Sequence, residues 1–145
     1  MTNSKKIQVL FLCTHNQARS QMAEAILRHI GKGRYEVFSA GSDPATEIHP
    51  MAVKAVSEVE VDMTDQKPTH LDLYKDQSFD YVVTTCDRIK EVCPVFPGDP
   101  VLIHWSLPDP TATLGTEREK QAAFNSIAMD LQTRIRLFME LHRFK

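Results

Sequence analysis

The chain has 145 residues, of which 42% are hydrophobic and 25% are charged, and its formal net charge at neutral pH is −2. These values are ordinary for a globular protein, and we expect residues 1–145 to form a single domain with a substantial core. The weakly acidic balance argues against nucleic acid or an anionic membrane as the main partner. No run approaches the roughly 18 consecutive apolar residues that a membrane-spanning helix requires.

The N-terminus and the cysteines indicate a cellular location. Lys5 and Lys6 precede an apolar run of about six residues, which is shorter than the apolar region of a signal peptide. Three cysteines in a chain of this length do not make the disulfide framework of a small secreted protein. We therefore expect a cytoplasmic, reduced protein, and we expect it to be a monomer.

Four short apolar runs have the composition of strands, and three of them are nearly continuous, as is typical of strands covered on both faces. The four runs are Ile7–Leu12, Tyr35–Ala40, Tyr81–Thr85 and Val101–Trp105. Helical spacing between them predicts helices over Met22–Ile30 and Pro50–Val56. Strands that alternate with helices indicate an α/β fold, with a mainly parallel four-stranded sheet flanked by helices on both faces.

The last helix has the clearest start. Thr116 and Glu119 form a T-x-x-E capping box. Apolar or aromatic side chains then recur at steps of three or four residues: Phe124, Ile127, Leu131, Ile135, Phe138 and His142.

Two polar or proline-rich segments interrupt these patterns. Residues 62–77 are predicted to form a loop with at most one helical turn near Thr69–Leu73, because the segment is polar and contains Pro68. Residues 87–100 are predicted to be irregular, because prolines recur through the second half of the segment.

The stretch from Cys13 to Ser20 carries the strongest chemical signal. A thiol ends a predicted buried strand, an arginine six positions later begins a predicted helix, and a loop lies between them. The stretch consists of Cys13, Thr14, His15, Asn16, Gln17, Ala18, Arg19 and Ser20. Backbone N–H groups at a helix start bind oxyanions, the same field lowers the pKa of a cysteine, and an arginine holds two oxygens at once. The alternative is a cysteine that serves as a small buried hydrophobe.

Two further cysteines follow the third predicted strand. Cys86 and Cys93 are too far apart for a C-x-x-C redox motif, and they form a poor zinc site because no second ligand pair accompanies them. They are either two unrelated reduced cysteines or partners of Cys13. If the strands that end at Cys13 and Cys86 are neighbours, the two sulfurs face the same crevice, and thiols that converge on an oxyanion suit its reduction.

Asp109 and the histidines are the remaining candidate site residues. Asp109 lies between two prolines after the fourth strand, so a stiff loop holds this carboxylate at the same sheet edge as a potential general acid. The alternative is an ordinary Pro-Asp-Pro turn. His15 lies in the loop and can donate to an anion, His49 is expected to start a helix, and His29 and His142 are expected at the surface or partly packed. No two histidines have metal-ligand spacing.

These residues together resemble a known family. Cys13 to Arg19 matches the C-x5-R loop of the low-molecular-weight protein tyrosine phosphatase fold, and Asp109-Pro110 matches its late acid. Within that fold the chain is most similar to the thioredoxin-coupled arsenate reductases. That similarity rests on Arg19 to Glu24, Ser39-Ala40-Gly41, Cys86 with Cys93-Pro94, and His104-Trp105.

The resemblance implies an activity. Arsenate would bind in the loop, where phosphate or sulfate can mimic it, and Cys13 would attack arsenic while Asp109 protonates the departing oxygen. Cys86 would then attack Cys13 and expel arsenite, and Cys93 would take over the disulfide as Cys86–Cys93. Thioredoxin would reduce that disulfide, although glutaredoxin or a low-molecular-weight thiol remains open.

The loop departs from the family pattern at three positions. Glycine is usual where His15 stands, and we expect a bulky residue to adopt that backbone conformation reluctantly. Gln17 and Ala18 also differ but are tolerable. Some members bind potassium at positions that match Asn16, Glu24 and Ser39, whereas no other cofactor is implied.

Two other functions remain open. A phosphatase acting on phosphotyrosine or small phosphomonoesters would use Cys13, Arg19 and Asp109 without the later cysteines. Phosphatases of this fold usually carry aromatic residues just after the acid, but here Thr111 to Leu114 follow Pro110. A binding module that has lost turnover is disfavoured, because the nucleophile, the arginine and the acid are all present.

Overall fold

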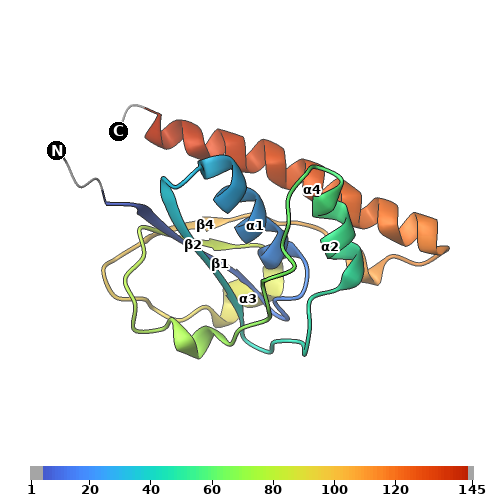
Figure 1. The fold of residues 1–145 in the computed structure, drawn as a ribbon. Helices are drawn as coiled ribbons and strands as arrows, with labels where there is room; N and C mark the ends of the chain where they lie inside the picture. Colours follow the sequence, from blue (N-terminus) through green and yellow to red (C-terminus); the bar gives the residue numbers. More distant parts are fainter. Residues whose placement is uncertain (1–4, 144–145) are drawn as a thin grey trace.

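The computed structural model describes residues 5–143, which form one parallel four-stranded sheet with helices on both faces (Figure 1). The strands are β1 (Ile7–Cys13), β2 (Tyr35–Gly41), β3 (Tyr81–Thr84) and β4 (Val101–His104), in the spatial order β2-β1-β3-β4. All three strand pairs are parallel. The predicted fold class is confirmed. Because β1 and β3 are neighbours, the predicted approach of their carboxyl ends is confirmed as well.

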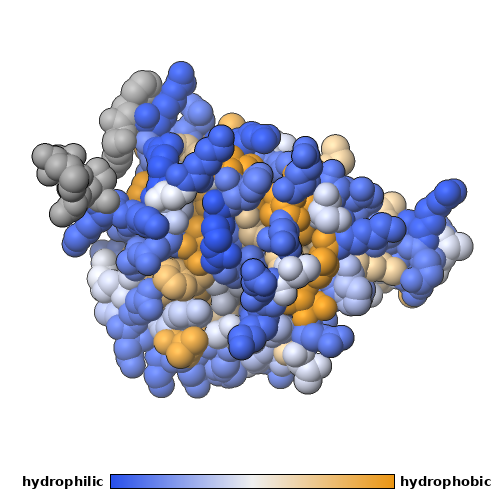
Figure 2. All heavy atoms as spheres, viewed as in Figure 1, coloured by the Kyte–Doolittle hydropathy of each residue, from blue (hydrophilic) through white to orange (hydrophobic). Residues whose placement is uncertain are grey.

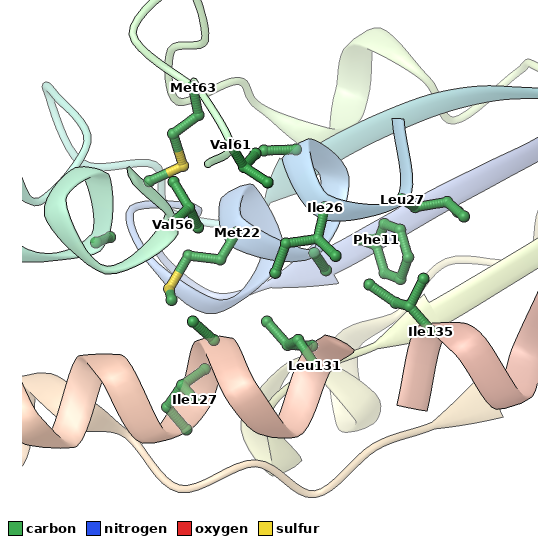
Figure 3. Close-up of a cluster of buried hydrophobic side chains, with 14 of the residues drawn as sticks. Phe11, Met22, Ile26, Leu27, Val56, Val61, Met63, Ile127, Leu131 and Ile135 are labelled. Atoms are coloured by element: carbon green, nitrogen blue, oxygen red, sulfur yellow. The ribbon is translucent and has the colours of Figure 1, made fainter. Parts of the chain in front are cut away.

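Three helices lie on one face of the sheet: α1 (Arg19–Gly31), α2 (Pro50–Ser57) and α4 (Glu117–Met139). Figure 3 shows how Leu131 and Ile135 of α4 point toward Met22 and Ile26 of α1. Phe11 of β1 lies in the same buried cluster. Val9 and Phe11 face this cluster, whereas Leu10 and Leu12 face the other one. The uninterrupted apolar run of β1 therefore reflects a strand that is covered on both sides.

The opposite face of the sheet has a thinner cover. It consists of α3 (Asp87–Val92), a 3₁₀ turn over Leu71–Leu73, and aromatic side chains that include Phe79 and Phe96. Polar side chains dominate the face of the molecule seen in Figure 2, with apolar atoms showing in narrow strips between them. Within residues 5–143 no helix combines the length and apolar character needed to cross a membrane.

The C-terminal helix matches its predicted start and its buried stripe. Thr116 accepts a hydrogen bond from the N–H of Glu119, whose side chain accepts one in return from the N–H of Thr116. Every predicted stripe residue from Phe124 to His142 is buried. A short 3₁₀ turn, Glu140–His142, follows α4. The single turn expected near Thr69–Leu73 is also present.

Two expectations about these elements were wrong. The segment predicted to be irregular from residue 87 begins with α3, which escaped the prediction because Ile89 is its only buried residue and leaves no apolar period. His142 is only 2% exposed, whereas His29 is exposed as expected. The His142 ring bridges the hydroxyls of Tyr35 and Tyr81 at 2.9 Å each. These partners come from two strands far away in the sequence, so local spacing could not reveal them.

Candidate active site

The loop between β1 and α1 exposes its N–H groups because its carbonyl groups are engaged elsewhere. The carbonyls of Thr14, His15 and Gln17 accept backbone hydrogen bonds, each 2.9 Å long, from the segment that runs from Asp43 to His49. Within residues 5–143, no N–H group of residues 15–19 donates to a nitrogen or oxygen of the protein. These N–H groups at the start of α1 therefore form a cradle for an oxyanion.

Asn16 holds this loop in shape. Its φ angle is +49°, a left-handed conformation that asparagine tolerates better than most residues. Its side-chain amide donates to Ser20 at 2.7 Å and to Ser39 at 3.1 Å. Its side-chain oxygen accepts from the Gln21 amide and from the N–H of Thr69, both at 2.9 Å. The fully buried side chain thus has both N–H donors and its carbonyl oxygen paired.

The expectation that His15 strains the loop was wrong. The left-handed residue is its neighbour Asn16, and His15 is not among the non-glycine residues with positive φ. The His15 ring lies outside the cradle's backbone, where Nδ1 donates to the carbonyl of Asp43 at 2.9 Å. A carbonyl oxygen only accepts, so Nδ1 carries the proton in this contact. In a neutral ring, Nε2 is then the nitrogen without a proton.

Gly41 allows the edge strand to approach the loop. A Cβ atom at this position would lie 2.5 Å from the carbonyl oxygen of Thr14 and 2.8 Å from that of Cys13. Both distances are far below contact distance and involve backbone atoms, so any side chain would displace the loop. The glycine within Ser39-Ala40-Gly41 is therefore required by close packing of β2 against the cradle.

Arg19 and Asp109 face each other across the cradle. Arg19 Nη1 donates to the carbonyl of Leu107 at 2.9 Å, and Nη2 lies 3.9 Å from Asp109 Oδ1. Asp109 also accepts from the N–H and hydroxyl of Thr111, so its carboxylate is fixed at the start of a 3₁₀ turn, Pro110–Ala112. The structure thus brings the predicted arginine and the predicted acid to the same point.

Cys13 and Cys86 shift each other's pKa in opposite directions. The thiol of Cys13 is hydrogen-bonded to the Cys86 sulfur, and this bond together with burial raises the pKa of Cys13 although Arg19 lowers it. The same bond, with further hydrogen bonds from Thr14 and Ile89, lowers the pKa of Cys86 to about 5 despite desolvation. The expectation of a lowered pKa at Cys13 was therefore wrong for the anion-free protein. The two shifts favour the proton on Cys13 and the negative charge on Cys86.

Cys93 lies apart from this pair. Cys86 and Cys93 cap the two ends of α3, and Cys93 is half-buried. Burial raises the pKa of the Cys93 thiol. With about 1.5 Å of rise per residue, a helix of this length separates the two Cα atoms by about 10 Å, which exceeds the limit of about 7 Å for a disulfide. The fold thus brings two of the three cysteines together and holds the third at a distance.

Two connected cavities lie at this edge of the sheet. The inner cavity has a volume of about 20 Å³ and is lined by Cys13, by the loop from His15 to Arg19, and by Asp109 and Thr111. The outer groove, of about 510 Å³, shares His15, Arg19 and Asp109 with it and extends past Cys86 to Ser106. No phenylalanine, tyrosine or tryptophan lines either cavity. The site suits a compact ion better than an aromatic ring.

The residues expected to hold potassium lie together, but their oxygens are already engaged. Ser39 donates to Glu24 Oε1 at 2.6 Å, and the other carboxylate oxygen of Glu24 forms an ion pair with Arg28. Arg28 also donates to the carbonyl of Val37. Because a guanidinium supplies the positive charge at this point, the donor set fits a potassium ion poorly. Among the described residues, no three of His, Cys, Asp or Glu converge as metal ligands either.

The sequence did not reveal several partners of the site. Arg28, the Leu107 carbonyl and the pair Asp87 and His104 all act on site elements through contacts between distant parts of the chain. The position of Asp87 directly after Cys86 and the match of His104-Trp105 to the family were the available signals. His49 does start α2, as predicted, by accepting from the N–H of Met51 at 3.1 Å.

The comparisons with known proteins agree with this geometry. The family model for low molecular weight phosphotyrosine protein phosphatase matches residues 8–143. An arsenate reductase of Shouchella clausii is 40% identical over 139 residues, covering 94% of this chain and 97% of that protein. An arsenate reductase of Bacillus subtilis is 36% identical, covering 91% of this chain and 94% of that protein.

A solved structure shows the same fold. The thioredoxin-dependent arsenate reductase of Corynebacterium glutamicum superposes with a TM-score of 0.66 at 36% identity. This superposition covers 94% of the present chain and 65% of the Corynebacterium chain. The sequence resembles the phosphatase family through the loop from Cys13 to Arg19 and through Asp109, which together form the site described above. The chain belongs to the low molecular weight phosphotyrosine protein phosphatase family, which includes the arsenate reductases that it resembles in sequence.

Proposed function

We propose that the protein reduces arsenate to arsenite by a relay through Cys13, Cys86 and Cys93. The observation that carries the proposal is the contact between Cys13, at the base of the anion cradle, and the Cys86 sulfur. A phosphatase needs one thiol at this place, whereas reduction of the bound anion needs a second thiol within reach of the first. The names of the relatives from Shouchella and Bacillus support the same substrate.

In the first step arsenate occupies the cradle, with oxygens on the free N–H groups and on Arg19. The proton of Cys13 passes along its hydrogen bond to the Cys86 thiolate, which leaves a thiolate at Cys13 to attack arsenic. Asp109 gives a proton to the departing oxygen, which leaves as water. Arg19 stabilises the charge that develops on the remaining oxygens.

In the second step Cys86 attacks the sulfur of Cys13. The low pKa of Cys86 returns it to the thiolate form, and the electron pair of the arsenic–sulfur bond moves to arsenic, which leaves as arsenite. A Cys13–Cys86 disulfide remains. Cys93 then attacks Cys86, the disulfide moves to Cys86–Cys93, and Cys13 leaves as a thiolate.

The attack of Cys93 on Cys86 requires α3 to unwind, because the intact helix keeps the two residues about 10 Å apart. This helix is short, and Ile89 is its only buried residue, so its unwinding exposes little apolar surface. Exposed apolar side chains lie at the end of α3 and just beyond it: Val92 is 59% exposed and Val95 is 97% exposed. A reductant of the thioredoxin class would reach the Cys86–Cys93 disulfide on this surface.

Phosphatase activity is the second candidate, because Cys13, Arg19 and Asp109 form a complete set for phosphoryl transfer. The cavities lack the aromatic side chains that would hold a tyrosine ring, so small phosphomonoesters are the better substrates for such an activity. Phosphatase activity would give Cys86 and Cys93 no chemical role.

The test measures arsenate-dependent NADPH oxidation in the presence of thioredoxin and thioredoxin reductase. We expect Cys13→Ser, Cys86→Ser and Cys93→Ser each to abolish turnover. Mass spectrometry after a single turnover should find Cys13–Cys86 in the Cys93→Ser protein and Cys86–Cys93 in the unaltered one. Full activity of the Cys86→Ser and Cys93→Ser proteins would overturn the relay. Hydrolysis of para-nitrophenyl phosphate without any arsenate turnover would establish the phosphatase instead.

A further inference from the structure

Two side chains from outside α3 hold the start of this helix, and a third side chain holds one of them. His104, the last residue of β4, lies with Nε2 2.8 Å from Asp87 Oδ1. The hydroxyl of Ser106 donates to the same oxygen at 3.0 Å. Behind the ring, Nδ1 of His104 lies 2.6 Å from the hydroxyl of Thr84 at the end of β3. Asp87 follows Cys86 directly, so these contacts fasten the residue next to the reactive sulfur to two strands of the sheet.

These contacts join the Asp87 carboxylate, which is 77% exposed, to a His104 side chain that is 23% exposed. A carboxylate only accepts, so His104 Nε2 carries a proton whether the ring is neutral or charged. The hydroxyl of Thr84 can donate to Nδ1 or accept from it, and it therefore suits both forms of the ring. The hydrogen bonds from His104 and Ser106 also hold the pKa of the Asp87 carboxyl below its ordinary value. The contact is accordingly charged on at least one side at neutral pH.

Little else attaches α3 to the domain. Of its six residues Ile89 alone is buried, and Arg88, Lys90, Glu91 and Val92 are exposed. The proposed relay needs α3 in two states: folded, with Cys86 against Cys13, and unwound, with Cys86 against Cys93. A contact at the N-terminal end of the helix biases this equilibrium directly, because it exists in the folded state alone.

We propose that Asp87, His104 and Ser106 form a clamp that holds Cys86 against Cys13 and whose release permits α3 to unwind. They are positioning residues, because they touch neither the anion cradle's N–H groups nor the two sulfurs. This inference deepens the proposed relay and rests on it for its purpose. The clamp itself is a property of the reduced protein without arsenate, so it can be tested separately.

The first measurement is hydrogen exchange of the reduced, full-length protein, followed by mass spectrometry of peptides that cover residues 87–93. We expect Asp87→Ala and His104→Phe to speed exchange in α3 about five- to tenfold, with exchange in α1 and α4 unchanged. Asp87→Asn keeps an accepting oxygen and should have a smaller effect. Glu91→Ala is the matched control, since it removes an exposed α3 carboxylate that forms no side-chain hydrogen bond or ion pair with another described residue.

A double-mutant cycle separates the clamp from general effects of each substitution. The protein with both Asp87→Ala and His104→Phe should exchange no faster in α3 than the faster single variant, because either change breaks the same contact. Should His104→Phe disturb β4, Ser106→Ala provides a milder variant that removes one hydrogen bond and should speed exchange about two- to threefold.

The second measurement follows alkylation of Cys86 in reduced proteins that also carry Cys93→Ser. Cys86 is 4% exposed, so iodoacetamide reaches it when α3 opens. We expect the clamp variants to raise its alkylation rate by the same factor as the exchange rate. Unchanged exchange and alkylation in Asp87→Ala and His104→Phe, or an equal increase in Glu91→Ala, would overturn the clamp while leaving the reductase assay unaffected. Loss of the reductase assay with an intact clamp would instead count against the proposed function.

Discussion

The thiol of Cys13 is hydrogen-bonded to the sulfur of Cys86, although Cys13 ends β1 and Cys86 lies two residues beyond the end of β3. The neighbouring positions of β1 and β3 produce this contact, and it distributes one proton over two sulfurs. The direction of the two pKa shifts favours a negative charge on Cys86, next to the cradle, in the anion-free site. An incoming oxyanion meets a neutral Cys13, which avoids repulsion between two like charges.

The shared proton predicts the titration of the site. With Cys93→Ser as background, ultraviolet thiolate absorbance should show one thiolate forming near pH 5 and a second one only at strongly alkaline pH. Cys13→Ala removes the largest cause of the lowered Cys86 pKa, so the titration midpoint of Cys86 should rise toward its ordinary value. Cys13→Ser is the matched control, because its hydroxyl still donates and should keep the midpoint low. Equal midpoints in these two variants would contradict the shared proton.

Arg19→Lys should lower kcat/KM for arsenate by about 100-fold or more, because a lysine cannot bind two anion oxygens in the plane of a fork. It also cannot hold the Leu107 carbonyl and face Asp109 at once. Steady-state kinetics with thioredoxin measure the effect, and the melting temperature shows whether the fold is intact. Arg88→Lys, in the outer groove, is the control and should change kcat/KM little. A similar loss in both variants would show that overall charge, and not the fork, is what matters.

Asn16→Ala should reduce the free energy of unfolding by about 3 kcal/mol, since it breaks several buried hydrogen bonds and leaves alanine in a left-handed conformation. Denaturation with urea measures this loss. Asn16→Gly removes the same hydrogen bonds without the conformational strain, so it should be less destabilising by about 1 kcal/mol. If glycine proved as harmful as alanine, the strain argument would fail.

The ion pair between Arg28 and Glu24 predicts that potassium does not stabilise the protein. Because its guanidinium pairs with Glu24 beside Ser39, the melting temperature should be the same in potassium chloride and in choline chloride at equal ionic strength. Arg28→Met removes the internal cation, and potassium should then raise the melting temperature of the variant. A rise specific to potassium in the unaltered protein would show that the ion binds beside Arg28 after all.

Local patterns in the sequence predicted the elements and the cradle. The four apolar runs, the Thr116–Glu119 capping box and the spacing from Cys13 to Arg19 each depend on neighbours in the chain, and each agrees with the structure. Asp109 was placed correctly because the carboxyl ends of parallel strands meet at one edge. The expected cytoplasmic location, the monomeric state and the reductant stay predictions.

Contacts between distant segments could not be predicted in the same way. The four partners of Asn16 come from α1, β2 and the loop before the 3₁₀ turn, and the partners of His142 come from two strands. The direction of the Cys13 pKa shift was wrong for the same reason, because it depends on Cys86 more than on the loop itself. Helix α3 was missed because one buried residue carries no periodicity.

The length of α3 has a consequence for the protein's behaviour in air. A thiol with a partner in reach is oxidised to a disulfide, and one without a partner proceeds to sulfinic and sulfonic acids, which are not readily reversed. While α3 is folded, Cys13 lies beside Cys86. If peroxide oxidises Cys86 to a sulfenic acid, the Cys13 thiol should condense with it to form a disulfide that can be reduced. Cys93, with its raised pKa and half-buried sulfur, should react with peroxide more slowly than Cys86. If the proposed relay operates, a folded α3 therefore also limits irreversible oxidation of Cys86 between turnovers.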